Sequence, residues 1–342
     1  MIRVEAPSRL HFGLFALPRE EFWPNRQGEA RVPARRFGGV GLMVEAPGVA
    51  VSVRPATEWS AEGPLAERAL EYARRVTQSP HYIHVERCAA HHAGLGTGTQ
   101  LGLAIARALL ASWRNKPLEG QQATTDDTSL RGLTPPARQE IEPASLIGRG
   151  QRSAIGVHGF ARGGLLVEGG QRREGEVAPL IARCDFPDWP IVLAIPGFAQ
   201  GLHGQPERQA FERLLHAGAP LAETDALCRL ALLGMLPAVV EQDWQAFGEA
   251  VFDFNYRVGE LFASVQGGPY AHPRLAELVQ LIRQQGIAGV GQSSWGPALF
   301  AIASDADQAD FLVRNLKDRF GLAADEVQVT RACNRGARVW AD

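Results

Sequence analysis

The sequence contains few cysteines and no long apolar run. Its four cysteines, Cys88, Cys184, Cys228 and Cys333, are far apart and form no Cys-x-x-Cys pair, so neither a disulfide framework nor a zinc site is indicated. No apolar stretch approaches the roughly twenty residues of a membrane helix, and Met1–Ala6 lacks a secretory hydrophobic region. We therefore expect a cytoplasmic protein with no membrane partner, whose cysteines are buried thiols.

An excess of charge of either sign is also missing. The 35 Lys and Arg residues nearly balance the 37 Asp and Glu residues, for a net charge of -2, which argues against a general nucleic-acid binder and favours a small-molecule ligand. The 342 residues exceed the length of most single domains, so two domains are expected. Gln171–Asp188 is charged and irregular, which places the boundary there and predicts domains 1–185 and 186–342.

Glycine and threonine are concentrated in one stretch, His91–Ala106, which reads HHAGLGTGTQLGLAIA and runs into an apolar helical pattern. Glycines at 94, 96 and 98 allow close backbone approach to a ligand, and the following helix offers free N–H groups and a positive dipole end. The stretch lacks the Gly-Lys-Ser/Thr of a Walker loop and the downstream acid of a dinucleotide fingerprint. Its chemistry predicts phosphate binding; the alternative is a strand-to-helix turn with a Thr cap.

Two further stretches are rich in glycine. Gly148–Gly164 holds Arg149, Arg152 and Arg162 among six glycines, which favours an anion-facing loop or helix start, although solvated loop charges would give the same pattern. Gly289–Ala298 precedes a strand in the second half of the chain.

The periodicity predicts an α+β protein. Strands are expected at Ile2–Ala6, Arg9–Phe15, Phe37–Val44, Val49–Arg54, Tyr82–Glu86, Gly164–Glu168, Ile191–Ile195, Leu299–Ile302 and Glu326–Thr330. Helices are expected at Leu65–Thr77, Gln100–Trp113, Glu207–Leu215, Glu223–Leu236, Asp243–Gly259, Pro273–Gln284 and Asp305–Phe320. Pro18–Arg36 and Lys116–Gln139 are predicted as loops, the first mobile and the second containing short helical pieces. In the second half, strands separated by helices predict one antiparallel sheet with helices on one face.

Taken together, the stretches resemble the GHMP kinase superfamily and, more closely, the β-ribofuranosylaminobenzene 5'-phosphate synthase family. The matching segments are Ser8–Leu14, Gly38–Leu42, His92–Gln100, Gly148–Gly164 and Gly289–Pro297, so the resemblance covers essentially the whole chain. It implies a GHMP-kinase-like fold, with an N-terminal domain like ribosomal protein S5 domain 2, a C-terminal ferredoxin-like domain and a ligand cleft between them.

The resemblance implies an enzyme that joins 5-phosphoribosyl 1-diphosphate to 4-aminobenzoate, or a related aryl acid such as 4-hydroxybenzoate. The reaction releases carbon dioxide and pyrophosphate in tetrahydromethanopterin biosynthesis. Loss of pyrophosphate leaves oxocarbenium character at the ribose C1, which the electron-rich ring carbon attacks before decarboxylation. Such a site needs cations on the diphosphate and a dry wall for the ring. The expected cofactor is Mg2+, with no organic cofactor, and the expected assembly is a homodimer.

Site residues follow as hypotheses. The diphosphate-binding set is Gly94, Leu95, Gly96, Thr97, Gly98, Thr99 and Gln100; the catalytic set is Arg9, His11, Arg149 and Arg152; the substrate-closing set is Gln292, Ser293, Ser294 and Trp295. Arg9 and His11 alternate along one strand and so share a face, where they could meet the 5-phosphate or the aryl carboxylate. Trp295 is either an aromatic wall or core packing. His11, His92 and His158 could equally be structural.

Metal ligands stay unassigned, because neither Asp126-Asp127 nor Glu168 has a specific metal spacing. A GHMP small-molecule kinase is the main alternative, but it needs an acid to activate the acceptor hydroxyl. Here Ser153-Ala154-Ile155 is followed by Gly156, which cannot serve as that acid and so argues against the kinase interpretation. A non-catalytic binder of phosphate ligands is the third possibility.

Overall fold

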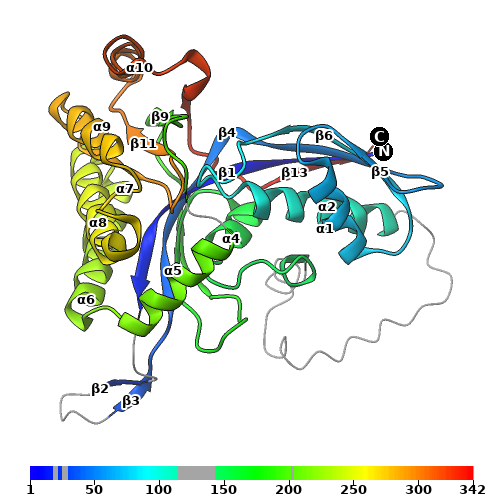
Figure 1. The fold of residues 1–342 in the computed structure, drawn as a ribbon, viewed down its shortest axis with the longest axis horizontal. Coiled ribbons are helices and arrows are strands. Elements are labelled where there is room, and N and C mark those ends of the chain that lie inside the picture. Colours follow the sequence, from blue (N-terminus) through cyan, green and yellow to red (C-terminus); the bar gives the residue numbers. More distant parts are fainter. Residues whose placement is uncertain (18–21, 25–29, 115–142, 202–203, 342) are drawn as a thin grey trace.

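The computed structural model describes residues 1–17, 22–24, 30–114, 143–201 and 204–341. Its two main sheets lie side by side, with most helices packed on them (Figure 1). In these ranges no helix is both long and apolar enough to cross a membrane.

The first sheet has the order β13-β1-β4-β6-β5, with β7 on β4 and β8 on β7. Its strands are β1 (Ile2–Ala16), β4 (Phe37–Pro55), β5 (Ser60–Glu62), β6 (His81–Cys88), β7 (Leu165–Glu168), β8 (Leu180–Cys184) and β13 (Arg338–Ala341). The predicted break at Pro7-Ser8 is wrong: β1 continues through an irregularity between Ala6 and Ser8. Likewise, β4 joins two predicted strands, and β8 forms in the segment predicted to be irregular.

Three helices cover one face of this sheet: α1 (Ala66–Val76), α2 (Thr97–Arg114) and α4 (Ile155–Arg162) (Figure 1). Apolar residues of α1 and α2, such as Tyr72, Leu101 and Ile105, are buried against sheet residues such as Val51 and Val85. The α1 prediction is confirmed to within one residue at each end. Helix α2 starts earlier than predicted, inside the glycine stretch.

The second sheet has the order β10-β11-β9-β12 and is wholly antiparallel, as predicted. Its strands are β9 (Ile191–Ala194), β10 (Gly289–Gln292), β11 (Leu299–Ile302) and β12 (Val327–Thr330). The prediction of helices on one face only is wrong. Val192 and Leu299 face a core shared with α9 and α10, whereas Leu193 and Phe300 face a second core that includes α8 and β1.

The helices of this half are α5 (Gly204–Ala217), α6 (Leu221–Leu230), α7 (Leu236–Glu241), α8 (Trp244–Gln266), α9 (Pro273–Gln284) and α10 (Ala306–Phe320). A π-helix, Ala231–Met235, links α6 to α7, and a 3-10 turn, Ala324–Glu326, precedes β12. The α9 prediction is confirmed at both ends, because Pro273 occupies the first turn and Gly286 follows. Asp243 and Asp305 cap α8 and α10 by accepting backbone N–H bonds at 2.9 and 2.8 Å.

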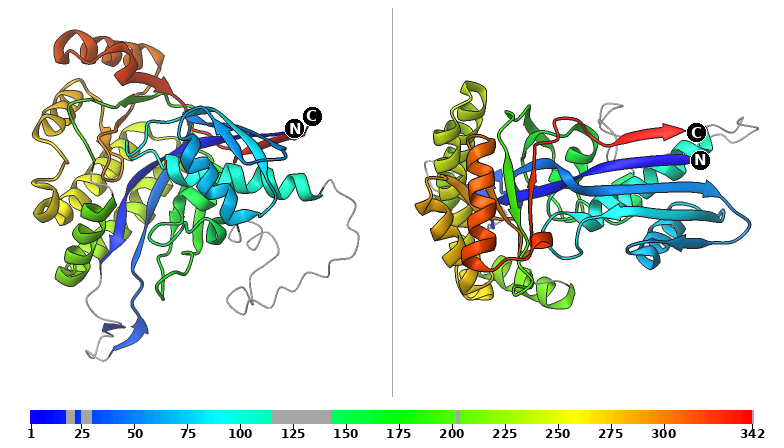
Figure 2. Two further views of the ribbon diagram at one scale, coloured as in Figure 1. Left: turned by 45° about the vertical axis from the view of Figure 1, so that its right-hand side comes forward. Right: turned by 90° about the horizontal axis from the view of Figure 1, so that it is seen from above.

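Two elements depart from the predicted order. A small hairpin, β2 (Phe22–Pro24) with β3 (Ala30–Pro33), forms where a loop was predicted; the loop prediction for Lys116–Gln139 lies outside the described residues. After β12 the chain returns to the first sheet, where β13 pairs antiparallel with β1. The two termini therefore lie next to each other (Figure 2).

Candidate active site

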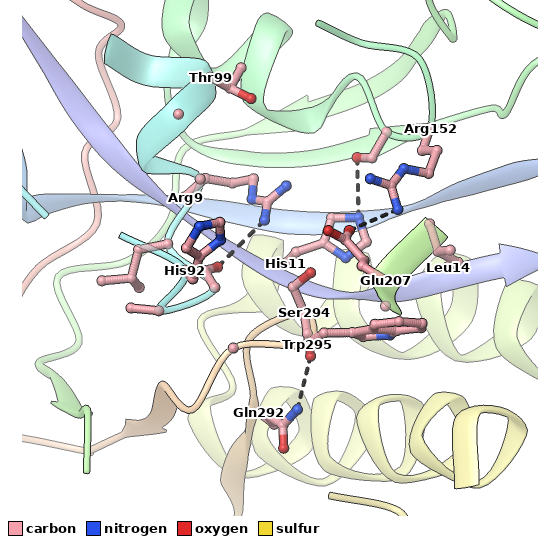
Figure 3. Close-up of a pocket in the computed structure, with 18 of the residues that line it drawn as sticks. Arg9, His11, Leu14, His92, Thr99, Arg152, Glu207, Gln292, Ser294 and Trp295 are labelled. Carbon is pink, nitrogen blue, oxygen red and sulfur yellow. Dashed lines mark hydrogen bonds and ion pairs between the residues drawn. The ribbon is translucent and has the colours of Figure 1, made fainter. Parts of the chain in front are cut away.

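A cleft of about 690 Å3 opens between the start of α2, the middle of β1, α5, α8 and the turn after β10 (Figure 3). Most of the predicted site residues line it: Arg9, His11, Gly94, Leu95, Gly96, Thr97, Gly98, Thr99, Arg149, Arg152, Gln292, Ser294 and Trp295. Gln100, Ser293 and Arg162 are absent from the lining. The three glycine-rich stretches, far apart in sequence, thus meet at one cavity.

The first turn of α2 is surrounded by arginines. A Cβ added at Gly98 would lie 2.9 Å from Nη2 of Arg149 and 3.5 Å from Nη2 of Arg68, and one at Gly96 would lie 3.1 Å from Cβ of Arg9. The glycines therefore let three guanidinium groups lie against the helix start with no side chain between. Together with the helix dipole, this makes a strongly cationic pocket.

Tyr72 of α1 positions two of these arginines. Its hydroxyl accepts hydrogen bonds from Arg68 Nε at 3.1 Å and from Arg149 Nη2, and both guanidinium groups lie within 6 Å of its ring centroid. Arg68 also contacts Nε2 of His91. Within the described ranges, no carboxylate lies within ion-pair distance of Arg68 or Arg149, so their charge is available to an anion.

Arg9 lies in the middle of β1, and its Nη2 donates to the Gly94 carbonyl oxygen at 3.4 Å. Burial lowers its pKa to about 10, while Glu168 and Glu207 act in the opposite direction. The guanidinium thus stays charged at neutral pH. Its Nε is buried and has no hydrogen-bond partner in the described structure.

His11 is held on both sides. The backbone N–H of His11 donates to Ser293 Oγ at 3.0 Å, and its backbone carbonyl oxygen accepts from Ser294 N–H at 3.0 Å. On the side chain, Nε2 lies 3.1 Å from Ser153 Oγ. Burial, with a smaller effect from Arg9, lowers the pKa of His11 well below its usual value. The imidazole is therefore neutral, so His11 adds no positive charge for the phosphate or carboxylate that it is predicted to meet.

Glu168, at the end of β7, lies behind Ser153 and is fully buried. Its Oε2 accepts the N–H of Ala154, and its Oε1 has no partner in the described structure. Burial raises its pKa to about 7, and the Ser153 hydroxyl is the neighbour that most opposes this rise. Glu168 has no metal-binding spacing in the sequence, and no sequence pattern indicates that it lies beside Ser153 and Ala154.

The other end of the cleft is aromatic. Trp295 stacks on Phe211 at 4.8 Å between ring centroids, with an interplanar angle of 7°. Arg152 covers Phe211 at 4.4 Å from its centroid and pairs with Glu207 at 2.8 Å. Because Glu207 and Phe211 are four residues apart on α5, one helical face holds the guanidinium group of Arg152 by an ion pair and by an aromatic ring. Trp295 is thus both cleft lining and packing.

Several predicted site groups bind protein instead of facing the cleft. Gln100 Nε2 donates to the Gly156 carbonyl oxygen at 2.8 Å, and Ser293 Oγ donates to the Gly94 carbonyl oxygen at 2.8 Å. The Thr97 hydroxyl donates to the Ala90 carbonyl oxygen at 3.1 Å. Gln292 lines the cleft, but its amide bonds Ala271 N–H and the Ser294 carbonyl oxygen. Among these contacts, the one between Ser293 and Gly94 joins the two halves of the molecule.

The seam between the sheets depends on glycine and one amide. A Cβ at Gly94 would overlap the Ser293 carbonyl oxygen, and one at Gly296 would overlap the backbone of Ala93. The buried Asn255 of α8 donates to the carbonyl oxygens of Phe12 and Gln292 at 2.7 and 2.9 Å and accepts from Gln292 N–H at 2.9 Å. One side chain thus binds β1 and β10 together.

Acidic groups are scarce around the cleft. Glu207 is the one carboxylate among the described lining residues, and no cluster of three metal-ligating side chains occurs in the described ranges. Mg2+ takes oxygen ligands and usually binds through one or two carboxylates plus substrate phosphates. Glu207 is already paired with Arg152, so the described residues do not make a magnesium site of their own. Gly156, in the first turn of α4, offers no acid for a kinase reaction.

Comparisons with known proteins agree with this geometry. Residues 235–322 match the family described as GHMP kinases C terminal. The chain is 32% identical to the β-ribofuranosylphenol 5'-phosphate synthase of Archaeoglobus fulgidus over 99% of each chain, and 29% identical to that of Methanothermobacter thermautotrophicus over 88% of each. A putative homoserine kinase from Listeria monocytogenes has the same fold, with a TM-score of 0.61, 18% identity and full coverage of both chains. The expected fold, with two sheets like the two GHMP domains, is confirmed.

Proposed function

Because the chain belongs to the β-ribofuranosylphenol 5'-phosphate synthase family, we propose that it joins 5-phosphoribosyl 1-diphosphate to a 4-substituted benzoate. The ring carbon bearing the carboxylate forms a C–C bond to the ribose C1, and pyrophosphate and carbon dioxide leave. The name of the relatives specifies a ribosylated phenol, which corresponds to 4-hydroxybenzoate as acceptor; 4-aminobenzoate would give the aniline product.

The observation that carries this proposal is the ring of Arg9, Arg68 and Arg149 around the start of α2. A diphosphate leaving group takes both electrons of the C1–O bond, so its departure is favoured by cations already in place. A helix terminus contributes only about 0.3–1 kcal/mol in exposed settings, so the arginines supply most of the stabilisation. Hydrogen bonds that Arg68 and Arg149 donate to the Tyr72 hydroxyl hold these two arginines in position before substrate binds.

The aromatic end suits the acceptor. Trp295, Phe211 and the edge-on Phe262 make an apolar boundary, and Arg152 places a cation beside it for the carboxylate. An apolar surround also favours decarboxylation, because the charge of the carboxylate disperses as carbon dioxide leaves. The cleft between these ends brings the two reacting carbons together while excluding water, which would otherwise capture the oxocarbenium ion.

Magnesium enters the proposal only as a companion of the substrate. The described lining lacks a carboxylate set for it, so we assign no protein ligand and derive no step from it. A homodimer and a cytoplasmic location also belong to the proposal. So do domains 1–185 and 186–342, except that β13 pairs with β1 in the first sheet. Light scattering of the purified chain tests the assembly.

The decisive experiment incubates the protein with 5-phosphoribosyl 1-diphosphate, Mg2+ and carboxyl-labelled 4-hydroxybenzoate or 4-aminobenzoate. We expect labelled carbon dioxide and pyrophosphate in equal amounts, and only when both substrates are present. A parallel reaction with ATP and candidate acceptor alcohols is followed for ADP. Acceptor-dependent ADP without carbon dioxide release would assign the chain to the small-molecule kinases instead. Binding of 5-phosphoribosyl 1-diphosphate with no turnover of either kind would favour a non-catalytic binder.

A further inference from the structure

Three polar side chains form a line from the cleft into the protein. His11 and Ser153 both line the cleft, and Glu168 is fully buried beyond them. None of the three binds the diphosphate in the proposed function, and two of them come from elements far apart in sequence from β1. Their arrangement requires an explanation of its own.

The hydrogen bonds available to Ser153 determine which of the three side chains donates and which accepts. A serine hydroxyl has one donor and two acceptor positions. Its oxygen is 3.3 Å from the donating N–H of Ile155 and 3.1 Å from Nε2 of His11. Oε1 of an ionised Glu168 has no other partner and can only accept, and the Ser153 hydroxyl lowers the pKa of Glu168. The single hydroxyl hydrogen is therefore assigned to Glu168, and the remaining lone pair accepts from His11. His11 must then carry its proton on Nε2.

This tautomer leaves Nδ1 of His11 as a bare acceptor in a cation-rich cleft. A neutral imidazole with an exposed lone pair attracts an N–H or O–H group and repels a phosphate oxygen. In the proposed reaction, the acceptor brings one such donor group: the hydroxyl or amine opposite the attacking carbon. The ribose hydroxyls of 5-phosphoribosyl 1-diphosphate are donors as well, but only the para O–H or N–H becomes acidic as the ring carbon attacks.

We propose that His11, Ser153 and Glu168 form a proton relay that takes the para O–H or N–H proton of the aryl acceptor as the C–C bond forms. This inference rests on the proposed function and assigns a role to a buried carboxylate that the diphosphate chemistry leaves unused. His11 is the catalytic residue of the three, and Ser153 and Glu168 position it and receive the proton.

The proton balance of the step closes. As the ring carbon attacks the ribose C1, the C1–O bond breaks and its electron pair leaves with pyrophosphate. The para proton passes to Nδ1 of His11, the Nε2 proton passes to Ser153, and the Ser153 proton passes to Glu168, which leaves a neutral dienone or imine on the ring. The C–COO⁻ bond then breaks, carbon dioxide leaves, its electrons restore the aromatic ring, and the proton returns to the para oxygen or nitrogen.

The charged groups around Glu168 fit this role. Arg9 on β1 and His158 on α4 are the charged or titratable side chains that act on its charge, and both lower its pKa. The backbone N–H of Ala154 does the same, whereas burial outweighs them all. The resulting pKa of about 7 matches a group that accepts and returns a proton near neutral pH.

The test compares Glu168→Gln and Ser153→Ala with wild type on two acceptors. With 4-hydroxybenzoate, we expect kcat to fall about 100-fold in Glu168→Gln, the lower end of the effect of general acid–base groups. With 3,5-difluoro-4-hydroxybenzoate, whose phenol is ionised at neutral pH, the variant needs no proton acceptor and should regain most of its relative rate. An equal loss on both acceptors would overturn the relay.

The pH profile gives an independent readout. Wild-type kcat with 4-hydroxybenzoate should rise as the pH passes through about 7, because ionised Glu168 is the active form, and Glu168→Gln should lose this rise. Glu86→Gln is the matched control: Glu86 pairs with Arg3 at 2.9 Å on the same sheet, outside the described lining, and its profile should follow wild type. A rise that persists in Glu168→Gln would contradict the proposal.

The tautomer of His11 can be measured without turnover. In 15N-histidine NMR above pH 8, we expect the His11 signal to report a proton on Nε2 and a bare Nδ1, and Ser153→Ala to give a mixture of tautomers. A proton on Nδ1 in wild type would overturn the relay even if the synthase activity is found. A wild type that shows the expected tautomer but turns over neither acceptor would refute the proposed function and leave the hydrogen-bond line standing.

Discussion

Two glycine-rich stretches that look alike in the sequence do different things in the structure. In His91–Ala106, the missing Cβ atoms of Gly96 and Gly98 leave room for arginine side chains at the cleft. In Gly289–Ala298, the missing Cβ of Gly296 leaves room for the backbone of Ala93. In the first stretch, the missing Cβ of Gly94 leaves room for the backbone of Ser293. The comparison teaches that a glycine's role depends on what its absent Cβ would touch: side chains in the proposed diphosphate pocket, backbone in the seam.

The largest effect is expected at the seam. In Gly296→Ala, the new Cβ overlaps the Ala93 and Gly94 backbone, which cannot move without separating the two sheets. We expect the free energy of unfolding to fall by about 3 kcal/mol, measured by urea denaturation. The control is Gly286→Ala, where the Cβ meets no atom within 4 Å but the residue keeps a φ of +81°, and the loss should be about 1 kcal/mol. Equal losses would show that the seam admits the added Cβ at no greater cost than the backbone strain at Gly286.

Gly96→Val should separate ligand binding from stability. Its Cβ presses on the Arg9 side chain and it has a φ of +71°, so the arginine ring opens and binding of 5-phosphoribosyl 1-diphosphate is lost while the fold is largely retained. Calorimetric titration measures the affinity. Gly175→Val carries similar strain at φ +82° in open space and should bind normally. Unchanged affinity in Gly96→Val would show that the stretch is only a turn.

Arg149→Met should lower kcat/KM for 5-phosphoribosyl 1-diphosphate about 100-fold, because a charge-assisted contact is worth about 1.5–3 kcal/mol. The control is Arg75→Met. Arg75 lies 6.0 Å from the same Tyr72 ring centroid and donates to the Ile147 carbonyl oxygen, but is outside the described lining. Steady-state kinetics with each variant distinguishes charge at the diphosphate from packing on Tyr72. A similar loss in both would indicate packing.

The smallest effect is expected at the aromatic end. Trp295→Leu removes a stacked pair worth about 0.5–1.5 kcal/mol, so KM for the aryl acid should rise by less than about tenfold while KM for 5-phosphoribosyl 1-diphosphate stays unchanged. Trp340→Leu, on the exposed strand β13, is the control. A rise in both KM values of Trp295→Leu would place the residue in the seam and not in the acceptor pocket.

Most of the fold was predictable because its signals are local. The α9 bounds follow from Pro273 and Gly286, and the buried strands follow from apolar runs. The strand β13 was missed because its residues are all exposed, and it is held by pairing with β1, more than 300 residues away. The strand β10 was missed because glycine occupies two of its four positions, one of them to admit Asn255.

The position of the site could be predicted from the glycine and arginine content of three stretches, but the role of each residue could not. Glycine and arginine content located the cleft, but it did not distinguish Gln100 and Ser293, which bind backbone carbonyls, from the residues that line it. Arg68, Glu207 and Phe211 lie on amphipathic helices whose pattern gives no sign of a ligand. Glu168 ends a short apolar strand, and only the tertiary fold shows that it lies behind Ser153. Ser153 itself falls within Gly148–Gly164 and could have been included.

Asn255 has a consequence for how this scaffold can diversify. Opening the seam would leave its amide and the backbone groups of Phe12 and Gln292 buried without partners, at about 1–3 kcal/mol for each group. The hydrogen bonds of Asn255 therefore fix the distance between the proposed diphosphate pocket and the second half of the molecule. Descendants of such a protein can explore new aromatic acceptors through substitutions on α5, which carries Glu207 and Phe211, while the chemistry of the leaving group is inherited unchanged.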